Sequence, residues 1–237
     1  MKALILNSGM GSRMGEITSK HPKCMTEIDG QETILSRQLK LLQKTPIREV
    51  VITTGYYDDV LTDYCVSLNL PFEFTFIKNE KYQSTNYIYS IYCAREYLQD
   101  DILLLHGDLV FSERAVQKLM AYTQSCMAVC AAQALPQKDF KAVVSDGRIQ
   151  KIGIEFFENA VAAQPLYKLN KKDWEVWLQS IVDFCDSGNV GCYAENAWNA
   201  VSDKSAIYPI DMEEDICCEI DNPEDLEWVK RRLNHER

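Results

Sequence analysis

The sequence predicts an α/β fold, a Rossmann-like sheet that is mixed but mostly parallel and flanked by helices, with a smaller lobe in the second half. Three apolar runs without helical spacing, at 2–6, 50–54 and 102–105, are typical of strands buried on both faces of a sheet. Helical patterns separate these runs, and such alternation gives right-handed crossovers in a parallel sheet. Ligands of such sheets bind at the carboxyl ends of the strands, so we expect the functional site where the three runs end.

The composition is that of an ordinary globular protein and argues against several classes of partner. The 237 residues are enough for one domain with a full core. Lys and Arg number 25 against 35 Asp and Glu, and the net charge of −10 argues against general nucleic-acid binding. No apolar run reaches membrane-spanning length, and the first strand follows Met1 without a signal-peptide pattern. Nine cysteines without Cys-x-x-Cys spacing indicate neither a disulfide framework nor a zinc ribbon. We therefore expect a cytoplasmic protein with no membrane and no nucleic-acid partner.

The remaining elements of the first half follow from hydrophobic periodicity. Residues 33–44 carry an apolar stripe at helical spacing, and 72–77 alternate as a strand. Further helices are expected at 61–68, 87–98 and 112–121. Ser84 or Thr85 is a candidate cap for the helix that begins near residue 87.

The second half predicts antiparallel pairing and a closing strand and helix. A strand is expected at 127–133, and a turn at 146–147 joins 141–144 to 149–156 as a hairpin. Helices are expected at 171–184 and up to residue 201, followed by a strand at 216–221. Pro223 suits the first position of the last helix, which makes Asn222 its N-cap.

The loop after the first strand has the composition of a phosphate site. Gly9 and Gly11 let the backbone adopt positive φ and approach a ligand closely. Successive amides of such a loop bind anions, and the guanidinium of Arg13 adds a bidentate fork. The dinucleotide fingerprint fails because its third glycine position is occupied by Met14, and a P-loop is excluded because no Gly-Lys-Ser/Thr sequence follows.

Two acidic residues follow predicted strands, and the first of them lies at the same sheet edge as the phosphate loop. Asp108 ends the run that begins at residue 102, and Asp221 ends the last predicted strand. Simpler interpretations are a turn residue for Asp108 and an acid favoured by the helix dipole for Asp221. His106 is assigned no role, because strand-end histidines more often pack than bind.

The pattern Gly9-x-Gly11-Ser12-Arg13-Met14, then Thr18, then Pro22-Lys23, resembles the signature of nucleotidyltransferases that join a nucleoside triphosphate to a phosphorylated small molecule. The chain is most similar to bacterial choline-phosphate cytidylyltransferases and their relatives acting on 2-aminoethylphosphonate. The resemblance implies a fold of the nucleotide-diphospho-sugar transferase type. Asn7-Ser8 replaces the usual Ala-Ala pair and adds polar groups near the nucleotide.

The resemblance implies a role for each residue that matches the family pattern. Lys23 and Arg13 would be catalytic, at the α-phosphate and the β,γ-phosphates, and Asp108 and Asp221 would bind Mg²⁺. The implied nucleotide-binding residues are Leu6, Asn7, Ser8, Gly9, Gly11, Ser12, Gly55, Tyr82 and Asn86. The implied acceptor-binding residues are Tyr167, Tyr193 and Glu195. The single domain 1–237 would comprise a nucleotide-binding core (1–125), an acceptor-binding part (126–215) and a closing strand and helix (216–237).

The function implied is transfer of CMP from CTP to a small amino-bearing phosphate or phosphonate, with release of pyrophosphate. Phosphocholine and 2-aminoethylphosphonate both remain open as acceptors, because Ala194 stands where relatives have a Trp beside the cationic head. The alternatives are a sugar-1-phosphate nucleotidylyltransferase, a dehydrogenase-like dinucleotide domain and a non-catalytic nucleotide-binding regulator. The sequence leaves the oligomeric state open, a homodimer included.

Overall fold

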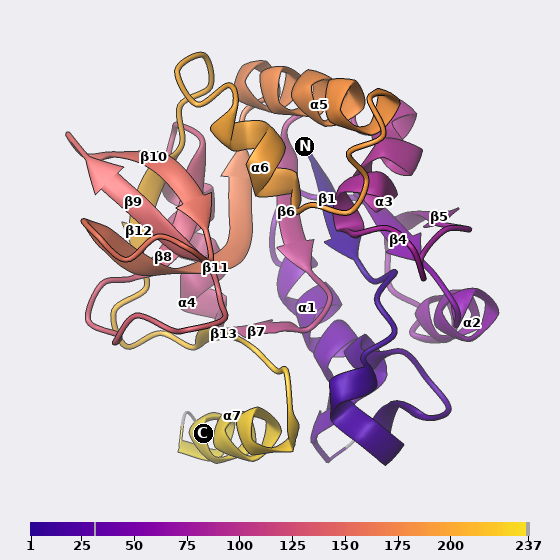
Figure 1. The fold of residues 1–237 in the computed structure, drawn as a ribbon. Coiled ribbons are helices and arrows are strands. Elements are labelled where there is room, and N and C mark those ends of the chain that lie inside the picture. The colour runs from indigo at the N-terminus through magenta and orange to yellow at the C-terminus, as the bar shows by residue number, and fades with distance from the viewer. Residues whose placement is uncertain (31, 236–237) are drawn as a thin grey trace.

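The computed structural model describes residues 1–30 and 32–235, and within them a mixed sheet of nine strands forms the centre (Figure 1). Four strands of the first half are parallel neighbours in the order β6-β1-β4-β5. Their bounds are β1 (Lys2–Leu6), β4 (Glu49–Thr54), β5 (Glu73–Lys78) and β6 (Ile102–His106). The apolar runs of the sequence therefore form the parallel core, as predicted.

The second half of the chain adds antiparallel strands to the same sheet. One edge of β11 (Ala160–Leu169) pairs with β9 (Lys141–Ser145) near its start and with β6 near its end. Its other edge pairs with β8 (Cys126–Cys130). β10 (Arg148–Gly153) forms the predicted hairpin with β9, and β12 (Tyr208–Asp211) pairs with β8. β11 joins the two halves of the molecule, although no pattern in the sequence predicted it.

Helices cover both faces of the sheet, because alternate strand residues point to opposite sides. On β1, Leu4 and Leu6 pack towards α3 (Tyr87–Ala94), α5 (Lys171–Asp186) and α6 (Ala194–Asn199). Ala3 and Ile5 pack towards α1 (Ile34–Leu42), α2 (Asp58–Ser67) and α4 (Glu113–Ala121). Trp174 and Trp177 of α5 are fully buried, so both belong to the core.

The end of the chain returns to its beginning. β13 (Cys217–Glu219) pairs antiparallel with β7 (Leu109–Phe111), and α7 (Pro223–His235) packs against the β2 (Glu27–Asp29) and β3 (Glu32–Thr33) region. In Figure 1 the yellow α7 and the indigo segment that follows β1 both lie at the lower end of the molecule. The side chain of Asn222 accepts from the amides of Glu224 and Asp225, so Asn222 is the predicted N-cap. Asp221 is therefore free of the capping role.

Two further observations bear on the expectations from composition. All nine cysteines are free thiols, which agrees with the absence of a disulfide framework. No helix in the described ranges combines the length and the apolar character needed to cross a bilayer.

Candidate active site

A cleft of about 420 Å³ opens at the carboxyl ends of β1 and β6, where the sequence placed the site. Of the predicted residues, those that line it are Leu6, Asn7, Ser8, Gly9, Gly11, Arg13, Lys23, Tyr82, Asn86, Asp108, Tyr193 and Asp221. The lining residues not assigned a role from the sequence include Tyr87, His106, Lys138, Asp139, Phe140 and Glu219. The loops after strands far apart in the sequence thus meet in one cavity.

The first loop is held by contacts with β4 and α3. The amide of Asn7 donates to the carbonyl of Thr53 at 3.1 Å, and the hydroxyls of Ser8 and Ser90 lie 2.6 Å apart. Gly11 has φ +63°, the conformation that favours glycine. Gly9 does not adopt positive φ, so that part of the prediction was wrong: the turn is made at Gly11 and again at Gly15.

Gly55 supports the loop from behind and does not line the cleft. A Cβ at this position would lie 2.4 Å from the carbonyl oxygen of Ser8, so only glycine lets the loop backbone pack this closely. Ser12 begins the 3₁₀ segment Ser12–Thr18, and its side chain lies outside the described part of the structure.

The two predicted metal ligands converge on Lys23. The ammonium of Lys23 donates to Oδ2 of Asp108 at 2.6 Å and to Oδ1 of Asp221 at 2.7 Å. Arg13 adds a second cation on the far oxygen of Asp221, at 2.9 Å. One nitrogen atom therefore joins two carboxylates that are 113 positions apart along the chain.

The electrostatics of this cluster favour its charged form. Burial lowers the pKa of Lys23, but the charges of Asp108 and Asp221 outweigh burial and raise the pKa above its ordinary value. Burial raises the pKa of Asp108, but the ammonium of Lys23, together with His106, more than offsets burial, and the net pKa is below the ordinary value.

These residues fit a divalent cation. Two carboxylates from separate segments meet at a point that already holds one positive charge, the ammonium of Lys23. Carboxylate oxygens are the ligands that Mg²⁺ prefers in proteins, usually one or two of them together with substrate phosphates.

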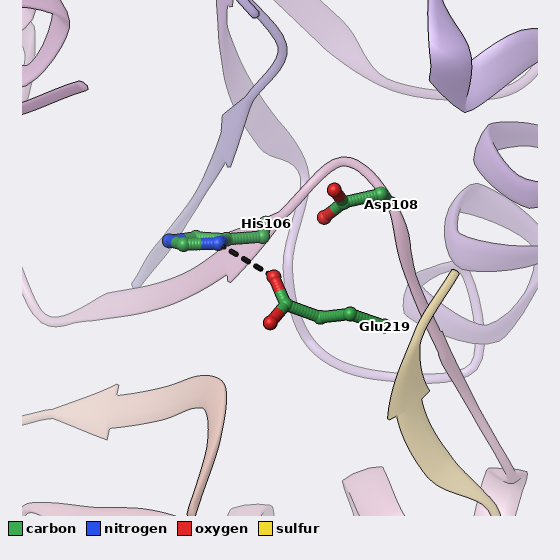
Figure 2. A group of neighbouring side chains, drawn as sticks. All are labelled: His106, Asp108 and Glu219. Atoms are coloured by element: carbon green, nitrogen blue, oxygen red, sulfur yellow. Dashed lines mark hydrogen bonds and ion pairs between the residues drawn. The ribbon is translucent and has the colours of Figure 1, made fainter. Parts of the chain in front are cut away.

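His106 and Glu219 form a pair beside Asp108, as Figure 2 shows. Nδ1 of His106 lies 2.9 Å from Oε1 of Glu219, and one ligand atom from each of the three residues falls within 4.8 Å of the others. Burial, with the charge of Asp108, raises the pKa of Glu219 to about 7. A sequence signal existed, because each residue stands two positions before a predicted metal ligand, and i, i+2 side chains share one face of a strand.

Of the three residues predicted to bind the acceptor, one lines the cleft and two lie behind its wall. Tyr193 lines the cleft, with its ring 5.2 Å from that of Phe140. Glu195 is only 1% exposed, and it accepts from the hydroxyls of Tyr87 and Tyr167, the latter at 2.8 Å. Glu195 and the fully buried Tyr167 therefore lie behind the wall of the cleft, where Glu195 fixes Tyr87.

Tyr82 and Asn86 also line the cleft. Asn86 is the N-cap of α3, and its side-chain oxygen accepts from the amide of Tyr87 at 2.8 Å. The predicted cap, Ser84 or Thr85, was therefore wrong, because Asn86 caps this helix, and Asn86 also lines the cleft.

Comparison with known proteins finds relatives whose names concern cytidylyl transfer. The CTP:phosphoglutamine cytidylyltransferase of Campylobacter jejuni is 32% identical over 126 residues, which are 51% of this chain and 48% of the relative. The CMP-5'-(3-aminopropyl)phosphonate synthase of Streptomyces rubellomurinus is 33% identical over 135 residues, 57% of this chain and 21% of the relative. The chain thus spans about half or less of these curated relatives.

A solved structure gives the fold over the whole chain. The CTP:phosphocholine cytidylyltransferase LicC of Streptococcus pneumoniae superposes with a TM-score of 0.78 at 21% identity, covering 98% of each chain. This likeness confirms the predicted nucleotidyltransferase fold. The family model of the MobA-like NTP transferase domain matches residues 3–169, which include the first loop, Lys23 and Asp108. The chain therefore belongs to the family of MobA-like NTP transferase domains.

Proposed function

We propose that this protein is a cytidylyltransferase that transfers CMP from CTP to a small amino-bearing phosphate or phosphonate and releases pyrophosphate. The observation that carries the proposal is the meeting of Asp108, Asp221 and Lys23 beside a glycine-turned loop in one cleft. The names of the relatives support cytidine as the base and a phosphate or phosphonate as the acceptor.

In this reaction an oxygen of the acceptor's phosphate or phosphonate attacks the α-phosphorus of CTP. The new P–O bond forms as the bond between the α-phosphorus and the bridging oxygen breaks, and the electron pair leaves with pyrophosphate. A phosphate monoester has a second pKa near 6, so the attacking oxygen is already ionised at neutral pH and needs no general base. The demands on the protein are positioning and charge neutralisation.

The residues of the cleft meet these demands. The ammonium of Lys23 would stabilise negative charge on the α-phosphate, and Arg13 would bind the departing β,γ-phosphates. Asp108 and Asp221 would hold Mg²⁺, which when bound supplies positive charge at the phosphates. With Mg²⁺ and CTP bound, Lys23 and Arg13 would contact phosphate oxygens in place of the carboxylates of Asp108 and Asp221.

The acceptor's amino group has a suitable wall in the same cleft. Tyr87, Tyr193 and Phe140 present aromatic rings there, and Glu219 adds a carboxylate. Rings and a carboxylate attract both a quaternary and a primary ammonium. Phosphocholine and 2-aminoethylphosphonate are therefore the first acceptors to test.

The test is release of pyrophosphate by the purified protein with Mg²⁺. CTP should react with phosphocholine or 2-aminoethylphosphonate, and ATP, GTP and UTP should react much less. Reaction only with sugar 1-phosphates would make the protein a sugar nucleotidylyltransferase. Absence of pyrophosphate with every acceptor would make it a nucleotide-binding regulator.

A further inference from the structure

The loop 131–139, between β8 and β9, forms one wall of the cleft. Lys138 and Asp139 line the cavity, and so does Phe140, whose ring packs against that of Tyr193. At the other end of the cleft, partial burial and the charge of Asp221 raise the pKa of the Asp139 carboxyl. The loop therefore extends from the metal-binding carboxylates to the aromatic wall.

A buried lysine fixes the shape of this loop. Lys141 is fully buried, and its ammonium donates to the carbonyls of Pro136 at 2.6 Å and Asp139 at 3.0 Å. The same nitrogen lies 4.3 Å from the centre of the Phe157 ring. A buried ammonium is costly unless its donors are satisfied, so the two loop carbonyls and the ring hold each other in place. The backbone of Lys141 is itself fixed in the sheet, opposite Gly153 and Ala162.

Three lysine and arginine side chains line the cleft, and only one of them lacks an ionic partner within the described part of the chain. Lys23 and Arg13 both contact the metal-binding carboxylates. Lys138 makes no ion pair and no side-chain hydrogen bond among the described residues, although it faces a cavity lined by four carboxylates. Its ammonium is thus available to a ligand.

We infer that Lys138 binds the phosphate or phosphonate of the acceptor and that Lys141 positions the loop that carries it. The inference rests on the proposed function. An acceptor with its reactive oxygen at the Asp108–Asp221 end and its ammonium at the aromatic wall lies along this loop. The triphosphate already has Arg13, Lys23 and the amides of the first loop, whereas the second anion has no other unpaired cation among the described lining residues. A lysine ammonium is a compact charge that suits a tetrahedral oxyanion.

The test separates the two substrates by their Michaelis constants. Lys138→Ala should raise KM for the acceptor about tenfold or more, the effect of losing one charged hydrogen bond, and leave KM for CTP within about twofold. Lys138→Arg should recover most of the loss. Lys172→Ala, an exposed lysine of α5 outside the cleft, is the matched control and should leave both constants unchanged.

Two further measurements sharpen the test. One shows whether Lys138 binds the acceptor's anion or its amino group, and the other shows whether Lys141 positions the loop or only stabilises the fold. Methylphosphonate, which lacks an amino group, should inhibit wild type competitively against the acceptor and inhibit Lys138→Ala at least about tenfold more weakly. Lys141→Met keeps the aliphatic stem and removes the donors, so it should raise KM for the acceptor without raising KM for CTP. A change in melting temperature alone, with both constants unchanged, would overturn the role of Lys141.

The outcomes also distinguish this inference from the proposed function. Wild type that releases no pyrophosphate with any acceptor overturns the proposed function and this inference with it. Active wild type with an unchanged acceptor KM in Lys138→Ala overturns the inference alone. The same holds if KM for CTP rises instead, because Lys138 would then bind the triphosphate.

Discussion

Replacement of Lys23 by alanine tests the catalytic centre most severely. The ammonium contacts both Asp108 and Asp221, and only 12% of its side chain is exposed. Loss of one preorganised donor to developing charge typically lowers kcat by about 10²–10³, or about 2.7–4 kcal/mol. We therefore expect Lys23→Ala to lower turnover by more than about a hundredfold.

The same substitution also changes stability and metal binding, and these effects must be measured separately. Breaking a buried ion pair costs about 3–5 kcal/mol, but the two carboxylates are each 23% exposed, so water reduces this cost. Without the competing ammonium, Mn²⁺ should bind the free protein more tightly in Lys23→Ala than in wild type, because the two carboxylates then lose their shared counter-charge, and Asp221 keeps only the ion pair with Arg13 within the described part of the chain.

The assay is steady-state pyrophosphate release at saturating substrates, with circular dichroism and thermal melting to establish that the variant is folded. Lys23→Met, which keeps the aliphatic stem, provides a second variant if alanine destabilises the fold. Near-normal turnover in either folded variant would refute the role of Lys23. Unchanged Mn²⁺ affinity would refute the competition between the ammonium and the metal.

The remaining predictions concern the metal ligands and the first loop. Asp108→Asn and Asp221→Asn should each lower turnover by more than about a hundredfold and weaken Mn²⁺ binding to the CTP complex, as seen by calorimetry. Chelation by EDTA should abolish pyrophosphate release, and excess Mg²⁺ should restore it; activity that survives chelation would exclude the metal. Gly55→Ala should destabilise the protein by about 1–3 kcal/mol and raise KM for CTP, because the new methyl group meets the Ser8 carbonyl at 2.4 Å. Gly191→Ala, in open space, is its control in thermal melts, and equal effects of the two changes would contradict the packing argument.

The parallel half of the fold could be predicted because its signals are local. Strands buried on both faces are continuous apolar runs, and β1, β4 and β6 lie within one residue of those runs. Because parallel strands end at the same edge, the positions of Asp108 and the first loop followed directly. The position of Asp221 depends on β13, which brings the end of the chain back beside β7. The resemblance to the family was what predicted that Asp221 joins the site.

The central antiparallel strand could not be predicted in the same way. β11 contains Pro165, which removes a backbone donor and argues against a central strand. The structure accommodates it with an irregularity, because the register to β8 shifts between Ala163 and Tyr167. Tertiary pairing on both sides therefore overrides the local signal.

The unpredicted site residues depend on this second half of the sheet. Lys138 and Asp139 line the cleft from a loop whose carbonyls at Pro136 and Asp139 accept from Lys141. Tyr87 and Glu195 meet across α3 and α6, a contact between elements more than a hundred residues apart. No local pattern marks such a pair, whereas His106 and Glu219 can be found in the sequence because each ends a strand two positions before Asp108 or Asp221.

The most direct measurement of the central claim is ³¹P NMR of CTP with Mg²⁺, the protein and each of phosphocholine and 2-aminoethylphosphonate. The proposed function predicts loss of the three CTP signals, appearance of pyrophosphate, and a new pair of coupled resonances from CMP joined to the acceptor's phosphorus. CTP that remains intact with both acceptors, or that couples only to a sugar 1-phosphate, would contradict it.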